Sequence, residues 1–206
     1  MKKTIMIFAI LAVFLAGVSI FVSNHKAISD NNVTKIIQSA SYPKFDLPDL
    51  VSYSQLIVTG VVEKIGQPMW NNRDNKKPDT ITGSDTIYRD IIIKVSNVEK
   101  GSIKGDKVIV RLFGGTIDGF IIDNTSQPEL TEGMEIVAFL IPDSTPYNKE
   151  KSADHYIFKG AAQGVYKLQS DQAENVHGKI KLSDFRSIEK EYLAKPKVKQ
   201  PVVSQE

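Results

Sequence analysis

Most of the chain between residues 56 and 182 is divided into short apolar stretches that are rich in β-branched residues and bounded by glycine, proline, asparagine or aspartate. This pattern is typical of β-strands that are joined by turns. One convincing helical period follows, with Phe185, Ile188 and Tyr192 on one face and Ser183 expected as the N-cap. Because no helix-length segment separates the strands, the sequence favours a mainly antiparallel β-barrel or a two-sheet sandwich over a βαβ fold.

The individual strands are predicted from the alternation of apolar residues and from the turn residues between them. Gly60 lies inside the first strand, where a glycine usually marks a bulge or a sharp bend. The second and third strands are expected to form a hairpin through a glycine-bounded turn, and a later pair is expected around Gly160 and Gly164. The predicted strands are 56–65, 86–98, 107–113, 116–122, 134–141, 155–159, 163–169 and 179–182.

The N-terminus decides the predicted location. Residues 4–22 contain no charged side chain, and the run is close to the roughly 20 residues that cross the hydrocarbon core of a bilayer. Lys2 and Lys3 precede the run and are expected to stay in the cytoplasm, so the rest of the chain lies outside. The run is predicted to be an uncleaved single-pass membrane anchor, because no good small-x-small cleavage site follows it. The alternative is a cleaved signal sequence, which would make the protein secreted.

Four segments are predicted from the changes in composition along the chain. The membrane anchor or signal sequence (1–23) is followed by a polar stalk (24–48) that is rich in serine and asparagine. The β-barrel domain (49–194) begins with one or two helical turns over residues 49–54. The remaining segment (195–206) has three lysines, two prolines and no apolar period, so we expect a disordered tail.

Composition excludes several kinds of chemistry. The chain has no cysteine, which excludes a disulfide scaffold, a cysteine-ligated zinc or iron–sulfur site and a thiol nucleophile. The formal net charge of +2 comes entirely from Lys2 and Lys3, so the predicted exported part is neutral. Without a basic groove, no nucleic-acid partner is expected. No His-x-x-x-His pattern or calcium-loop spacing occurs, and no metal or cofactor is predicted.

Two polar segments are candidate contact surfaces. The first is the loop 66–85, which is long for a compact domain and carries Trp70. Trp70 either folds back onto the barrel or is an exposed anchor for a partner, since tryptophan is enriched among interface hot spots. The second segment, 114–123, is interpreted as a Gly-Gly bulge with an Asp-Gly turn, and a ligand rim is the alternative. The candidate residues of the second segment are Gly114, Gly115, Asp118 and Asp123.

His155 opens a predicted strand and is the candidate for acid–base chemistry. With Asp118 and Asp123 it would form the site of an envelope hydrolase, provided that the three side chains converge in a pocket. A surface histidine without such a role is the favoured interpretation.

One layout extends over about residues 56–168 and is carried by 56–62, 88–95, 98–101, 105–110 and 139–141. It consists of a strand with an internal glycine, a long strand, a Lys-Gly turn, a Gly-Asp strand and a Leu/Phe strand. In this layout the chain resembles a group of uncharacterised bacterial secreted proteins, and it is also similar to the OB-like barrel of netrin and tissue-inhibitor-of-metalloproteinase domains. The resemblance implies an OB-like barrel but no activity, because those inhibitors present an N-terminal cysteine to the zinc of their target and this chain has none.

The sequence thus predicts an extracytoplasmic, membrane-anchored module that binds or interacts without catalytic activity. Its expected partner is another envelope or extracellular protein, and the segments 66–85 and 114–123 are the expected contact surfaces. Two alternatives stay open. One is the envelope hydrolase, and the other is an inhibitor of secreted proteases, which would require a protruding extended loop.

Overall fold

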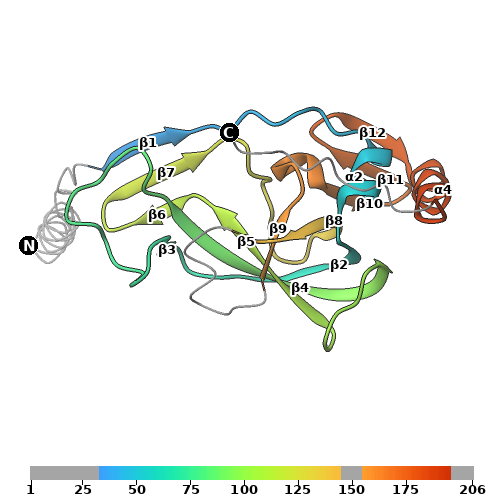
Figure 1. The fold of residues 1–206 in the computed structure, drawn as a ribbon, viewed down its shortest axis with the longest axis horizontal. Helices are drawn as coiled ribbons and strands as arrows, with labels where there is room; N and C mark the ends of the chain where they lie inside the picture. Colours follow the sequence, from blue (N-terminus) through green and yellow to red (C-terminus); the bar gives the residue numbers. More distant parts are fainter. Residues whose placement is uncertain (1–32, 145–154, 196–206) are drawn as a thin grey trace, which may run out of the picture. The chain divides into compact units, whose positions relative to one another are not determined.

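The computed structural model describes residues 33–144 and 155–195, which fold around a β-barrel (Figure 1). The predicted anchor or signal sequence, the first part of the predicted stalk and nearly all of the predicted tail lie outside the described residues. Within the described ranges, no helix is long and apolar enough to cross a membrane.

Five strands close into the barrel. Neighbouring strands are antiparallel except for β5 and β9, which are parallel, and the pairing of β9 with β8 closes the ring. Because the ring of strands is closed, the architecture is the predicted barrel and not the two-sheet sandwich. In order around the barrel, the strands are β2 (Leu56–Ile65), β4 (Ile87–Lys100), β5 (Lys107–Phe113), β9 (His155–Phe158) and β8 (Glu135–Pro142).

Alternation along the strands supplies the barrel core. In β5, Val108 and Val110 face the interior and are buried, whereas Lys107 and Ile109 face outward and are exposed. Each large apolar side chain that is fully buried contributes roughly 1.5–3 kcal/mol, so this interior is a main source of stability. The other strands add Leu56, Val58, Val62, Ile91, Ile93, Ile136, Ala138, Leu140 and Phe158 to the same core.

Gly60 allows β2 to bend across β4, as the sequence predicts. The register between the two strands shifts between Thr59 and Gly60. A Cβ atom at Gly60 would lie 2.4 Å from the carbonyl oxygen of Lys94, far inside van der Waals contact. Only a residue without a side chain permits this close approach of the two backbones.

A second layer covers the outer face of β2 and β8, so that β2 is buried on both faces. Ile57 points into this layer and packs with Phe139 and Phe185. Helix α2 begins with a capping box, in which the Asp46 side chain accepts a hydrogen bond from the N–H of Asp49 (2.9 Å). The layer consists of helices α2 (Leu47–Tyr53) and α4 (Leu182–Leu193) and strands β10 (Val165–Gln169), β11 (Gln172–Asn175) and β12 (Gly178–Lys181).

Two predictions in this second layer are wrong. Strands β9 and β10 pair with β8 and not with each other, because the chain turns aside at Gly160, whose left-handed conformation starts the short 3₁₀ turn η1 (Ala161–Gly164). The N-cap of α4 is Lys181 and not Ser183, since the chain passes directly from β12 into the helix. The Ser183 hydroxyl instead donates to the side chain of Asp184 (3.2 Å).

A small three-stranded sheet lies beside β3 and the start of β4. Its inner face carries Ile36 and Ile122, which pack against Trp70 in a satellite core. The predicted stalk therefore ends early, because residues 34–38 form a strand that pairs in parallel with β7. The sheet consists of β1 (Thr34–Gln38), β7 (Phe120–Asn124) and β6 (Gly115–Ile117), and β3 covers Met69–Trp70.

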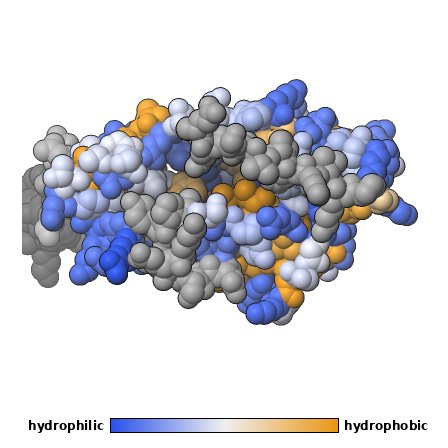
Figure 2. Space-filling view, in the orientation of Figure 1, coloured by the Kyte–Doolittle hydropathy of each residue, from blue (hydrophilic) through white to orange (hydrophobic). Residues whose placement is uncertain are grey.

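Strand β1 leaves its other face to solvent. Figure 2 shows a small hydrophobic patch over β1. Ile37 is 66% exposed and Val33 is 50% exposed. Of the two isoleucines of the strand, Ile36 packs against the satellite core and Ile37 is accessible.

Candidate functional site

An opening lies beside the closed barrel, where β9 and β10 diverge along β8. Strand β9 pairs with β5 over only two residues, and β10 then continues along β8 and pairs with β11. Within the described residues, the end of β5 (112–113) has no strand partner on the side away from β4. The segment 125–130 lies in this opening, where the N–H of Ala162 donates to the carbonyl oxygen of Ser126 (3.0 Å).

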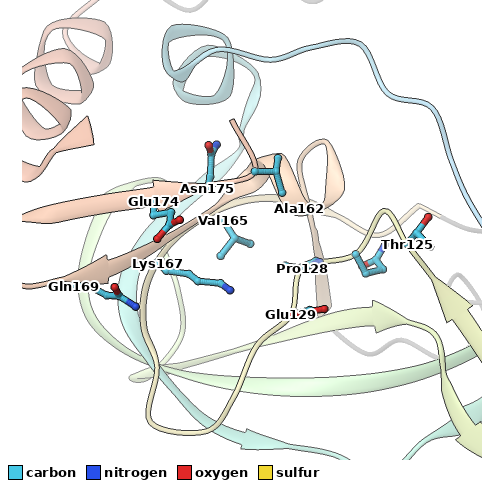
Figure 3. Close-up of a pocket in the computed structure, with 11 residues that line it drawn as sticks. Thr125, Pro128, Glu129, Ala162, Val165, Lys167, Gln169, Glu174 and Asn175 are labelled. Carbon is cyan, nitrogen blue, oxygen red and sulfur yellow. The ribbon is translucent and has the colours of Figure 1, made fainter. Parts of the chain in front are cut away.

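Two clefts flank this segment. The smaller cleft, with a volume of about 390 Å³, lies between the segment and strands β10 and β11 (Figure 3). The larger cleft, of about 830 Å³, lies between the segment and the β6–β7 hairpin. Because the clefts share four residues, they form one continuous surface, which we call the open-side groove. The shared residues are Thr125, Gln127, Pro128 and Glu129.

The smaller cleft is lined by apolar side chains, by polar ones and by charged residues of both signs, namely Lys167, Glu129 and Glu174. Figure 3 shows Lys167 extending from β10 toward the segment that carries Pro128 and Glu129. Lys167 makes no ion pair with any residue that the structure describes. Burial raises the pKa of Tyr166, which precedes Lys167 in the strand, to about 12, so this hydroxyl is neutral at physiological pH.

The larger cleft brings together three of the residues that the sequence singles out. Gly114 and Gly115 form its rim at the start of the β6–β7 hairpin, and Asp123 lies on the second strand of the hairpin. Gly114 has a φ of 105°, and a Cβ there would lie 2.9 Å from the carbonyl oxygen of Ile122, so the glycine is required by the backbone path. The Oδ2 of Asp123 lies 2.9 Å from the Nζ of Lys35.

Trp70 and Asp118 lie together, away from the rim of the groove. The indole N–H of Trp70 donates to Oδ2 of Asp118 (2.8 Å), and Trp70 is only 1% exposed. Asp118 and Gly119 form the expected turn, with φ values of 52° and 78°. Trp70 is therefore not an exposed anchor. The interpretation in which it folds back is the correct one, because its ring completes the satellite core.

His155 is buried at the other end of the barrel wall. Its Nε2 lies 3.0 Å from Oδ2 of Asp143, and both side chains are at most 1% exposed. The strand register aligns His155 with Ile92 of β4. It aligns Trp70, the hydrogen-bond partner of Asp118, with Ile87 of the same strand. These two positions are five residues apart, which is about 17 Å along β4. The structure does not bring Asp118, Asp123 and His155 together, and the expected surface histidine is a buried one.

Arg89 lines the larger cleft and is missed by the sequence interpretation. It is half-buried, on the face of β4 that carries Ile87, Ile91 and Ile93. Its Nε is buried and has no hydrogen-bond partner among the residues that the structure describes. From Ile87 to Ile93, every second residue of β4 is apolar except Arg89. A charged residue in such a row is the signal that could have identified it.

Among the residues that the structure describes, no three His, Asp or Glu side chains are grouped in a way that could hold a metal ion. No protein-family model matches the chain, and no curated protein matches it either. The function is therefore inferred from the open-side groove.

Proposed function

We propose that the protein is a non-catalytic extracytoplasmic binding module, anchored in the cell membrane by residues 4–22. The module holds an extended segment of another envelope or extracellular protein in the open-side groove. The observation that carries this proposal is the groove itself, two connected clefts where β9 and β10 diverge along β8. Concave surfaces with apolar walls and a few convergent polar groups are the usual ligand sites of proteins.

The end of β5 favours a peptide as the ligand. Residues 112–113 have no strand partner on the groove side among the described residues. An extended peptide can pair with such an edge through main-chain hydrogen bonds, while neighbouring pockets receive its side chains. Phe113 and Pro128 provide apolar walls for those side chains, and Thr116 and Asn124 provide polar groups.

The order of the strands also supports a binding role. We interpret the barrel as OB-like, because its first strand pairs with the second and the fourth while the third is parallel to the fifth. OB-type barrels bind oligomeric ligands on the face of their second and third strands and on adjoining loops. Here part of that face is covered, since the hydroxyl of Tyr88 donates to Asn75 in the loop 66–85 (3.3 Å). A ligand therefore finds more room in the open-side groove.

The two alternative functions have less support. The hydrolase would use Asp118, Asp123 and His155, but these side chains bond Trp70, Lys35 and Asp143 respectively. The protease inhibitor would need a protruding loop. The loop 66–85 is tied down instead, because the Gln38 side chain donates to the carbonyl oxygens of Gly83 (3.3 Å) and Asp85 (2.9 Å).

A selection of random peptides tests the proposal, because it requires no candidate partner. The full-length protein in detergent micelles is used to select binders from a displayed peptide library, and the affinity of each selected peptide is then measured. Thr125→Trp places a large ring where the two clefts meet, and Thr125 is exposed. We expect this substitution to weaken the selected peptides by about tenfold or more, because it fills the groove without removing a buried contact.

Thr80→Trp is the matched control, since Thr80 is exposed in the loop 66–85 and lines neither cleft. It adds the same ring and should leave peptide binding unchanged. Loss of binding in Thr80→Trp alone would move the contact surface to the loop. Selection of no peptide above background, or full binding by Thr125→Trp, would also overturn the proposal.

A further inference from the structure

Arg89 differs from the other arginines in its surroundings. Arg111 donates through Nε and Nη2 to the Asp90 carboxylate (2.8 and 3.0 Å), and Arg186 pairs with two glutamates. Within the described part of the chain, Arg89 forms no hydrogen bond or ion pair, and its Nε is buried without a partner. A buried guanidinium donor without an acceptor is costly to the folded state. Its position in the wall of a cleft points to an acceptor that comes from outside.

The carboxylates near Arg89 do not supply that acceptor. Asp90 is the next residue of β4, so its side chain lies on the opposite face of the strand, where it pairs with Arg111. Asp123 lines the same cleft, but its carboxylate lies beside Lys35. Glu129 is exposed where the two clefts meet and makes no ion pair with Arg89. Among the described residues, neither carboxylate of this cleft forms an ion pair with Arg89.

Resting on the proposed function, we propose that Arg89 binds a carboxylate of the partner segment, either an acidic side chain or the C-terminal carboxylate. A guanidinium offers parallel N–H donors that match the two oxygens of a carboxylate. A phosphate dianion also matches them, but Asp123 and Glu129 line the same cleft and oppose a second negative charge. Lys167, further along the groove, lies opposite Glu174 of β11, so the proposal is limited to one carboxylate, held at Arg89 (Figure 3).

The first test observes Arg89 directly in the wild-type protein. The chain has four arginines, whose Nε–H groups give four signals in nitrogen–proton correlation spectra, and Arg89→Lys identifies one of them. Sodium acetate, inorganic phosphate and sodium chloride are titrated at constant ionic strength. We expect acetate to shift the Arg89 signal in a saturable way and to leave those of Arg111 and Arg186 in place, because these are already paired.

Three results of this titration would overturn the inference. They are an Arg89 signal that acetate does not move, a shift that chloride produces equally well, and phosphate binding that is tighter than acetate binding. The first two would remove the anion site, and the third would reassign it to a phosphate group.

The second test uses the peptides selected on the open-side groove. Arg89→Gln should weaken their binding by about tenfold or more, the effect of losing one charge-assisted hydrogen-bonded pair. Arg89→Lys keeps the charge but not the paired donors and should have a smaller effect. Lys94→Gln removes the same charge from an exposed site on β4 outside both clefts and should have none. Peptides with amidated C-termini, or with Asn and Gln for Asp and Glu, identify which carboxylate is bound.

The two proposals fail in different ways. In one case, Thr125→Trp weakens peptide binding but Arg89→Gln binds the peptides as tightly as the wild type. The assignment of Arg89 is then wrong and the binding function stands. If acetate shifts the Arg89 signal but no peptide binds, the binding function is wrong and the carboxylate site stands.

Discussion

Trp70 shows how one polar contact settles the role of a residue. Its indole N–H donates to Asp118, and its ring packs edge-on against Phe120 at a centroid distance of 5.9 Å. The same bond holds Asp118 in a left-handed conformation that few residues other than glycine adopt readily. The loop 66–85 is thereby attached to the β6–β7 hairpin, and Trp70 belongs to the structure rather than to a contact surface.

Trp70→Phe keeps an aromatic ring in the satellite core but removes the N–H donor, leaving the Asp118 carboxylate without this bond. We expect the free energy of unfolding to fall by about 2 kcal/mol, the size typical of a hydrogen bond to a charged group. Urea unfolding followed by circular dichroism measures the change.

The wild-type protein offers an independent check, because Trp70 is its single tryptophan. Its fluorescence should have a short emission maximum and resist quenching by acrylamide, since the side chain is 1% exposed. An emission maximum typical of tryptophan in water would contradict the burial of Trp70 and restore the exposed-anchor interpretation.

At the level of elements, β2 depends on a glycine at the point where it bends. Gly60→Ala would place a Cβ 2.4 Å from the carbonyl oxygen of Lys94 and 2.9 Å from a methyl group of Ile93. One of the two central barrel strands must then move. We expect the free energy of unfolding to fall by about 1–3 kcal/mol, as is usual for overpacking, and a lowered midpoint in urea unfolding would show it.

Gly83→Ala is the matched control for this change. Nothing lies within 4 Å of a Cβ built at Gly83, and its backbone is not in the left-handed region. Its substitution should be neutral, or stabilising by up to about 1 kcal/mol through the unfolded state. Equal midpoints for Gly60→Ala and Gly83→Ala would mean that the strands do not approach as closely as described.

Strands with strong patterns could be predicted from the sequence, and strands that depend on a partner could not. The predicted bounds of β2 (56–65) and β5 (107–113) agree with the structure residue for residue, because both segments are β-branched and end at turn residues. Strand β3 has only two residues inside a polar loop, and β1 has weak apolar spacing. Both are strands because β4 and β7 offer them an edge, which no local pattern reveals.

At the level of the whole molecule, a buried polar cluster joins helix α4 to the barrel. Arg186 donates to Glu189 on its own helix (2.7 Å), to Glu99 of β4 (3.1 Å) and to the Thr59 hydroxyl of β2 (3.1 Å). Glu189 is only 2% exposed, and within the described ranges its Oε1 has no hydrogen-bond partner. The second layer is thus attached to the barrel by an ionic contact as well as by apolar packing.

This cluster makes stability depend on pH. Burial raises the pKa of the Glu189 carboxyl, and hydrogen bonding to Arg186 opposes the shift. Because the folded pKa lies above the unfolded value of about 4.3, the contribution of Glu189 is fully present below that value and is lost as the pH rises through the folded pKa. The free energy of unfolding of the wild type, relative to that of Glu189→Gln, should therefore decrease as the pH rises from the unfolded pKa to the folded pKa of Glu189. Urea unfolding at a series of pH values measures it.

Glu191→Gln is the control on the same helix. Glu191 is exposed and pairs with Lys195 at the surface, so its substitution should change the unfolding free energy little at any pH in the series. A constant difference between the wild type and Glu189→Gln across the series would contradict the assigned role of Glu189.

The sequence was sufficient for the class of fold, the bend at Gly60 and the Asp-Gly turn, because each follows from local alternation or from the conformational freedom of one residue type. Three of the residues that it singles out, Gly114, Gly115 and Asp123, lie in one cleft, and their role in binding stays a prediction. Closure of the barrel, the burial of Trp70 and His155 and the position of Arg89, without an ion pair among the described residues, depend on residues far apart in the chain. These features arise only when β9 and β10 separate along β8, because that separation closes the ring on one side and opens the groove on the other.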